Sequence, residues 1–186
     1  MVSFNYIYEL PFFRNSRGIA GAALRGWQFA GLGAVQSGMA YTVTTSGVDP
    51  AGLGNLGSSA SSGRPDMVCN PNQGQPNAYG SSAQGLQWFD KGCFVNVPSG
   101  VVRPGNAGRG TVRGPGFVNM DVTLSKNFNL AADGRVKLQV RMETFNTFNL
   151  VNPSGFASLN VTSTQFGQIS SFRAPRRAQI AAKIDF

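Results

Sequence analysis

Apolar and polar residues alternate along several stretches of the chain, and the alternation is compact in residues 177–186. Apolar side chains fall at every second position there, with polar side chains between them: Ala178, Ile180, Ala182, Ile184 and Phe186 against Gln179, Lys183 and Asp185. Because the side chains of a β-strand point alternately to its two faces, this pattern predicts a strand with one apolar and one polar face. Taken alone, the pattern is equally typical of a half-buried edge strand in a soluble β-sandwich and of a strand held at an interface.

The clearest alternation lies in two segments, 119–128 and 135–143. Their apolar faces carry Met120, Val122, Leu124 and Phe128 on the first segment, with Lys126 as the single cation, and Val136, Leu138, Val140 and Met142 on the second. The connection at 130–134 contains Asp-Gly, a strong signal for a tight hairpin turn. The sequence therefore predicts an antiparallel hairpin with one apolar and one densely polar face.

Two further strands are predicted near the beginning of the chain, at residues 2–10 and from about residue 26. In the second of these, Trp27, Phe29 and Val35 share one face, with glycines between them. One interpretation continues this strand through 41–44 after a kink near 37–38. The chain is thus expected to be all-β, with about five long strands.

Between about 45 and 113 the periodicity disappears, and the segment is rich in Gly, Ser, Asn and Pro. Only 87–89 and 94–97 offer local apolar anchors. A second connection, 145–176, is similar in composition, with short strand pieces expected near 166–172. Long irregular loops are uncommon in a compact soluble domain but normal on the extracellular side of an outer-membrane barrel. We therefore expect an antiparallel transmembrane β-barrel segment, with residues 1–186 forming one partial domain.

Loop lengths also predict an orientation. If the shorter connections are periplasmic and the longer ones extracellular, then Tyr8, Trp27 and Phe128 lie at the same membrane face as Phe186. Interfacial aromatic residues form such girdles in membrane barrels. Lys126 is then close enough to that interface for its ammonium group to leave the apolar layer.

Composition narrows the range of functions. Among 186 residues only 13% are charged, Lys and Arg exceed Asp and Glu by 16 to 8, and His is absent. The cations are scattered, so we expect no nucleic-acid partner. Without His, the usual general base and the commonest metal ligand are missing, so we expect neither an enzyme nor a cofactor. No signal peptide precedes the first strand, which predicts a fragment or a lost start if the protein is exported.

Several residues are candidate sites. Cys69 and Cys93 are the only cysteines. We expect a disulfide between them, with two free thiols or a metal site as the alternatives. The polar faces of the strands should line a lumen with Asp121, Lys137, Arg141, Glu143, Lys183 and Asp185, as a solute path or as a wall against a plug. The glycines at 105–116 precede a strand, not a helix, and therefore do not make a phosphate loop.

The series of local phrases resembles the carboxyl-terminal part of outer-membrane TonB-dependent receptors of the Oar-like type. The matching phrases are 26–31, 36–38, Arg64-Pro-Asp66, 105–109, 113–117, 120–128 and Glu143-Thr-Phe-Asn-Thr-Phe-Asn149. The resemblance implies a barrel of roughly 22 strands filled by a plug. It also implies location in the cell outer membrane and TonB-driven uptake of a large or scarce solute.

The resemblance also implies partners. These are outer-membrane lipid, the remainder of the barrel with its plug, TonB through an amino-terminal part that this chain lacks, and the barrel assembly machinery. That machinery is expected to recognise Ile180, Ala182, Ile184 and Phe186. Lacking plug and TonB segment, the chain is not expected to be active alone. The alternatives are a surface adhesin or passive porin-like barrel segment, and a soluble basic β-protein.

Overall fold

The computed structural model describes residues 1–11, 18, 23, 25–46, 49, 51–52, 63–76, 85–131 and 135–186. The chain divides into two compact units. The first, here called the sheet unit, comprises Met1–Gln36, Val118–Leu150 and Ala174–Phe186. The second, the loop unit, comprises Ser37–Phe117 and Val151–Arg173. No helix among the described residues is both long and apolar enough to cross a membrane.

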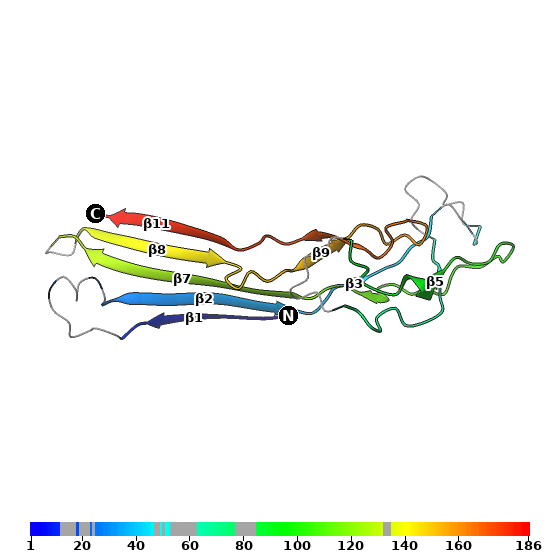
Figure 1. Ribbon diagram of the computed structural model, residues 1–186, viewed down its shortest axis with the longest axis horizontal. Helices are drawn as coiled ribbons and strands as arrows, with labels where there is room; N and C mark the ends of the chain where they lie inside the picture. Colours follow the sequence, from blue (N-terminus) through cyan, green and yellow to red (C-terminus); the bar gives the residue numbers. More distant parts are fainter. Residues whose placement is uncertain are drawn as a thin grey trace. The chain divides into compact units, whose positions relative to one another are not determined.

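The sheet unit is built on one antiparallel sheet of five strands in the order β1-β2-β7-β8-β11 (Figure 1). The strands are β1 (Val2–Glu9), β2 (Trp27–Gln36), β7 (Phe117–Asn129), β8 (Lys137–Phe145) and β11 (Arg177–Asp185). The five long strands predicted from the alternating pattern are therefore confirmed. The expected Asp-Gly turn at 133–134 lies outside the described residues.

The register brings like side chains onto the same face. Leu124 lies opposite Met142, which in turn lies opposite Ile180, and the same row structure repeats along β7, β8 and β11. Ser125 lies opposite Arg141 on the other face. Because a one-residue slip would move every side chain to the wrong face, this alternation specifies the register strongly.

The glycines of β2 make room for aromatic rings of β1. Gly31 lies opposite Tyr6, and Gly33 lies opposite Phe4. A Cβ atom added at Gly31 would be 2.5 Å from the Tyr6 ring, and one at Gly33 would overlap the Phe4 ring. The two rings therefore lie directly over glycine backbone, so larger residues are excluded there.

The phrase Glu143–Asn149 forms a hydrogen-bonded corner at the end of β8. Asn146 has a φ of 51° and is buried. Its side-chain amide donates to the carbonyl oxygens of Leu150 (2.9 Å) and Ala174 (3.3 Å), and its Oδ1 accepts from the Leu150 amide (2.8 Å). Asn and Asp are the non-glycine residues that adopt this left-handed conformation most readily. The corner thus fixes the approach of the chain to β11.

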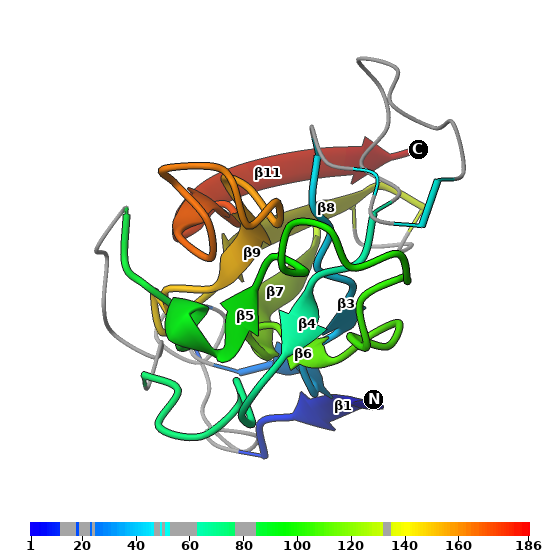
Figure 2. The same ribbon diagram turned by 90° about the vertical axis from the view of Figure 1, so that its right-hand side faces the viewer.

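The loop unit contains short strands in three antiparallel pairs (Figure 2). Its strands are β3 (Ala40–Tyr41) with β6 (Val112–Arg113), β4 (Asp66–Met67) with β5 (Phe94–Val95), and β9 (Pro153–Phe156) with β10 (Ile169–Phe172). A 3₁₀ turn, η1, spans Lys91–Cys93. β2 ends at Gln36, and of the expected continuation through 41–44 only Tyr41 belongs to a strand, the two-residue β3, which pairs with β6.

An aromatic cluster forms the core of the loop unit. Phe89 contacts Phe94, Phe156 and Phe166 edge-to-face, with ring centroids 5.9, 5.8 and 5.3 Å apart. Edge-to-face packing is a favourable arrangement for such rings. The described parts of 45–113 are therefore folded around a core rather than irregular. The sequence expectation of a loop without structure is corrected here: the core residues are far apart in sequence and show no periodicity.

Candidate functional site

The two faces of the sheet unit differ sharply in chemistry. The apolar face carries side chains from all five strands, and many of them are exposed: Val2, Phe4, Tyr8, Val35, Met142, Ile180 and Ile184. Ile180 is 79% exposed and Val2 is 66% exposed. Monomeric soluble proteins rarely expose a continuous apolar surface of this kind. This face therefore requires an apolar environment.

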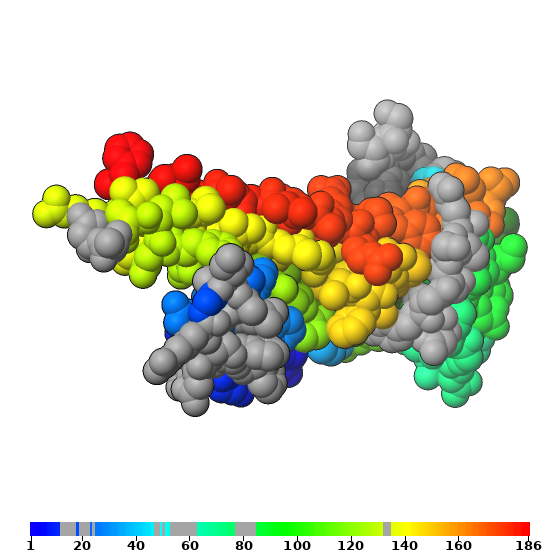
Figure 3. Space-filling model, turned by 60° about the vertical axis from the view of Figure 1, so that its left-hand side comes forward, coloured from blue at the N-terminus to red at the C-terminus, as the bar shows by residue number. Residues whose placement is uncertain are grey.

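The opposite face is polar and charged along β8 and β11. These strands lie side by side along the unit (Figure 3). Arg141 and Glu143 form an ion pair with a 3.5 Å separation, and Lys183 and Asp185 form one at 2.7 Å. Gln179 donates a hydrogen bond to Glu143. Arg141, Lys183 and Asp185 are exposed and Glu143 is half-buried, so the two pairs contribute little to stability. These charged pairs indicate that this face of the sheet contacts water.

The predicted lumen residues separate into two groups. Lys137, Arg141, Glu143, Lys183 and Asp185 lie on the polar face of β8 and β11, as expected. Asp121 is on the same face of β7 as Ser125, and its Oδ1 accepts hydrogen bonds at the corner, from the backbone amide of Asn146 (2.8 Å) and from the side-chain amide of Asn119 (2.8 Å). On β7, the residue opposite Glu143 is Thr123, so the carboxylates of Asp121 and Glu143 do not lie opposite each other.

The predicted interface aromatics lie at one end of the sheet, where β1 leads toward β2 and β7 toward β8. Tyr8 pairs with Phe29 one row from that end, and Phe128 shares a row with Leu138 and Ile184. Trp27 begins β2 at the same end.

Lys126 lies with these aromatic residues. Its ammonium nitrogen lies over the rings of Phe128 (4.8 Å) and Trp27 (5.5 Å), and it donates to the carbonyl oxygen of Ala23 at 2.6 Å. The Trp27 indole donates to the same carbonyl at 3.1 Å. The sequence predicted a cation that leaves the apolar face near this end, but it gave no signal for the backbone acceptor.

The candidate assembly residues lie on the apolar face of β11. Ile180, Ala182 and Ile184 are opposite Met142, Val140 and Leu138, and Phe186 follows the strand. Their role in assembly stays a prediction.

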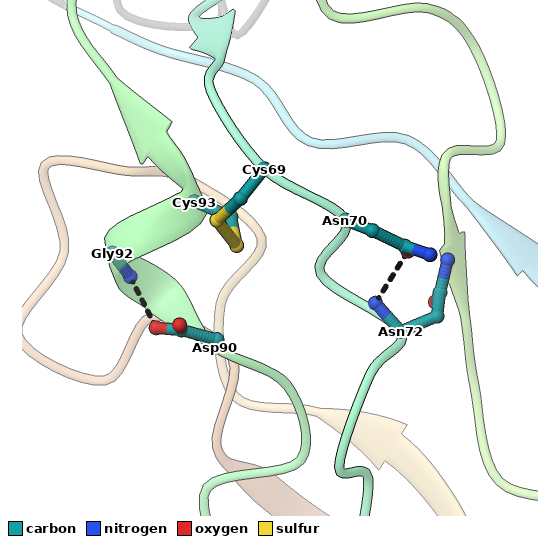
Figure 4. The surroundings of a disulfide bond; sticks show 6 residues. All are labelled: Cys69, Asn70, Asn72, Asp90, Gly92 and Cys93. Carbon is teal, nitrogen blue, oxygen red and sulfur yellow. Dashed lines mark hydrogen bonds between the residues drawn. A yellow bond between two sulfur atoms is a disulfide. The ribbon is translucent and has the colours of Figure 1, made fainter.

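Cys69 and Cys93 are joined by a disulfide, with their Cα atoms 4.8 Å apart (Figure 4). Cys69 follows β4 and Cys93 directly precedes β5, so the bridge lies beside the β4–β5 pair. Asp90 lies within 4.8 Å of both sulfur atoms. Its carboxylate accepts a hydrogen bond from the amide of Gly92 at 2.8 Å and so caps η1. Because the two sulfur atoms are bonded to each other, they are not available as thiolate ligands.

Beside β4, the buried carboxylate of Asp66 binds the exposed Arg103 and the backbone of Asn106, and the second contact joins two of the phrases that carry the family resemblance. Both Nη atoms of Arg103 donate to the Asp66 carboxylate at 2.7 Å, and the Asn106 amide donates to the same carboxylate at 3.0 Å. Chiefly because of the hydrogen bond from Arg103, the pKa of Asp66 falls from 3.8 to about 2. The pKa of Arg103 is raised by the same contact.

Neighbouring contacts extend this junction. Arg64 donates to the carbonyl oxygen of Gly108 at 2.9 Å, and the Asn106 side chain accepts from the Met67 amide at 2.6 Å. A Cβ added at Gly105 would overlap the backbone of Arg64 and Pro65. The phrases Arg64-Pro-Asp66 and 105–109 are therefore two halves of one packed junction, which requires glycine at the closest approach.

The exposed apolar face and the charged opposite face together define a membrane-spanning antiparallel sheet of the β-barrel class. Residues 1–179 match the family model of the outer membrane beta barrel domain, and the chain belongs to this family. It is located in the cell outer membrane. No curated protein and no solved structure gives a significant match to the chain. The predicted all-β barrel fold and outer-membrane location are confirmed.

Proposed function

We propose that the chain forms part of the barrel wall of a TonB-dependent outer-membrane transporter that takes up a large or scarce solute. The observation that carries the proposal is the open, two-faced sheet. It ends on β1 at one side and β11 at the other. Outer-membrane barrels need at least about eight strands to close, so further strands must complete the wall. A large barrel of this kind fits the receptor class that the local phrases resemble.

The polar face supports a wide, hydrated lumen. In small barrels, interior side chains fill the space and leave no aqueous path. Here Arg141 pairs with Glu143 within β8, and Lys183 pairs with Asp185 within β11. Such a wall can border water or a polar plug without an unpaired buried charge.

The loop unit supports contact with a solute outside the membrane. Its aromatic core, the Cys69–Cys93 bridge and the Asp66–Arg103 pair hold its described segments in fixed positions. A preorganised surface loses less conformational entropy on binding than a flexible one. The same compact unit favours a surface adhesin as the second candidate. We propose no catalytic role, because Asp121 is engaged by Asn146 and does not face Glu143.

A structure of the intact protein purified from outer membranes tests the proposal. A closed barrel of about 22 strands that contains a folded plug would support transport. Site-specific cross-linking between that protein and TonB in cells then tests coupling. A barrel with an unobstructed pore and no TonB cross-link would support the porin-like alternative. A plugged barrel without a TonB cross-link, whose loop unit binds a host surface, would favour the adhesin.

A further inference from the structure

A cavity of about 490 Å³ lies at the aromatic end of the sheet unit. Three charged residues line it: the cations Arg25 and Lys126 and the carboxylate Glu9. Two positive charges and one negative charge give this lining a net charge of +1. The lining also includes four polar residues that belong to the opposite, polar face of the strands: Gln28, Ser125, Asn127 and Asn129. The cavity is therefore suited to a ligand that carries one negative charge and several acceptor oxygens.

The lining includes residues from both faces of the sheet, and three of them belong to the lipid-facing side: Trp27, Lys126 and Phe128. Lys126 projects from the apolar face of β7, in the same row as Val140, and is 3% exposed. The rings of Trp27 and Phe128 lie against its ammonium group and also line the cavity. Aromatic residues of this kind mark the level of lipid headgroups in membrane proteins. The cations are thus located where the membrane itself supplies anions.

Arg25 is the accessible cation of the two. It is exposed and lies two residues before the start of β2, while Lys126 is held by the carbonyl oxygen of Ala23. A guanidinium group can bind phosphate oxygens in a bidentate manner, whereas an ammonium group acts as a point charge. The two residues can therefore have different roles. Arg25 donates hydrogen bonds to the ligand, and Lys126 contributes positive electrostatic potential from the cavity wall.

We propose that this cavity binds the headgroup of an anionic membrane phospholipid. The phosphodiester is held by Arg25 with the potential of Lys126, and the Trp27 and Phe128 rings contact the adjoining glycerol and first acyl carbons. A single phosphodiester charge balances the net charge of the lining. The proposal rests on the location of the sheet in the outer membrane and does not depend on a transport function.

The test uses the intact protein in nanodiscs that contain phosphatidylglycerol and phosphatidylcholine in equal amounts. Native mass spectrometry of the released protein measures the ratio of the two lipids that remain bound. We expect a preference for phosphatidylglycerol that falls about fivefold in Arg25→Gln, the effect of one basic residue near a membrane surface. Arg25→Lys should retain most of the preference.

Lys137→Gln is the matched control, because it removes a cation from the same end of the sheet but from the polar face. It should leave the lipid ratio unchanged. If Arg25→Gln and Lys137→Gln lose the phosphatidylglycerol preference to the same extent, the preference comes from general surface charge, and the proposal is overturned. So would an unchanged ratio in Arg25→Gln. Displacement of the bound lipid by millimolar inorganic phosphate would identify a site for free anions instead, and would also overturn it.

Discussion

Arg103 holds both carboxylate oxygens of Asp66, each through its own Nη atom and each at 2.7 Å. The two residues are separated by a stretch that includes the disulfide-bonded Cys93 and the strand β5. Their contact therefore ties the segment that follows β5 back to β4. A bidentate pair of this geometry is stronger and more specific than an ordinary surface ion pair.

The Asp66–Arg103 pair should make the loop unit sensitive to acid. The folded pKa of Asp66 is about 2, below the ordinary value of 3.8. A carboxyl group with a lowered folded pKa contributes stability above its unfolded pKa and loses that contribution as the pH falls through the folded pKa. We expect the urea midpoint of the loop unit to fall between about pH 4 and pH 2.

Fluorescence of Trp88 in a Trp27→Phe background measures this midpoint, because Trp88 is buried in the loop unit. Asp66→Asn should lower the midpoint at neutral pH and reduce its change between pH 4 and pH 2. If Asp66→Asn shows the same acid-induced change as the parent protein, another group is responsible for it.

The Cys69–Cys93 bridge should stabilise the loop unit against unfolding. The two cysteines are separated by 24 positions. Closing a loop of that length contributes about 3–4 kcal/mol in the chain-entropy treatment. The double variant Cys69→Ser with Cys93→Ser should show a loss of about that size in urea unfolding. Intact mass without reductant should be two hydrogens below the reduced mass; two alkylatable thiols would contradict the bridge.

Gly33 should not tolerate a larger side chain. The Phe4 ring covers its backbone, so Gly33→Val forces the ring to move and should cost about 1–3 kcal/mol. Ala34→Val adds bulk on the opposite face and is the matched control. Adding Phe4→Ala to Gly33→Val should recover part of the loss. Urea unfolding in lipid vesicles measures each variant; additive losses in the double variant would show that the ring is not the cause.

Asn146 should be required for the corner that leads into β11. Asn146→Ala removes three hydrogen bonds and puts at a φ of 51° a residue that adopts this conformation less readily than Asn, so we expect a loss of about 2–4 kcal/mol. Asn146→Gly restores the conformational freedom but not the hydrogen bonds, and should lose less. Equal stability of Asn146→Gly and the parent protein would show that only the backbone conformation matters.

The long strands could be predicted because their alternation records an environment that changes from one face to the other. Leu138, Val140 and Met142 share one face for the same reason that Arg141 and Glu143 share the other. The sequence of the loop unit shows no such alternation. Its strands are as short as Ala40–Tyr41, and two residues cannot show a period of two.

The contacts that hold the loop unit together join residues distant in sequence, such as Phe89 with Phe156. The apolar character of these residues predicted that they are buried, but not which residues they contact. The same limit applies to the cavity beside Lys126. The cation and the aromatic residues could be recognised from their positions, but the carbonyl oxygen of Ala23 belongs to the backbone and has no sequence signature.

The central claim is that one face of the sheet contacts lipid and the other contacts water. Spin labels placed singly at each position of 137–143 in the intact protein, reconstituted in lipid, test it by electron paramagnetic resonance. The account predicts high accessibility to oxygen at 138, 140 and 142, and high accessibility to a water-soluble nickel complex at 137, 139, 141 and 143, because alternate side chains point to opposite faces. A profile without this alternation, or with the two sets exchanged, would contradict it.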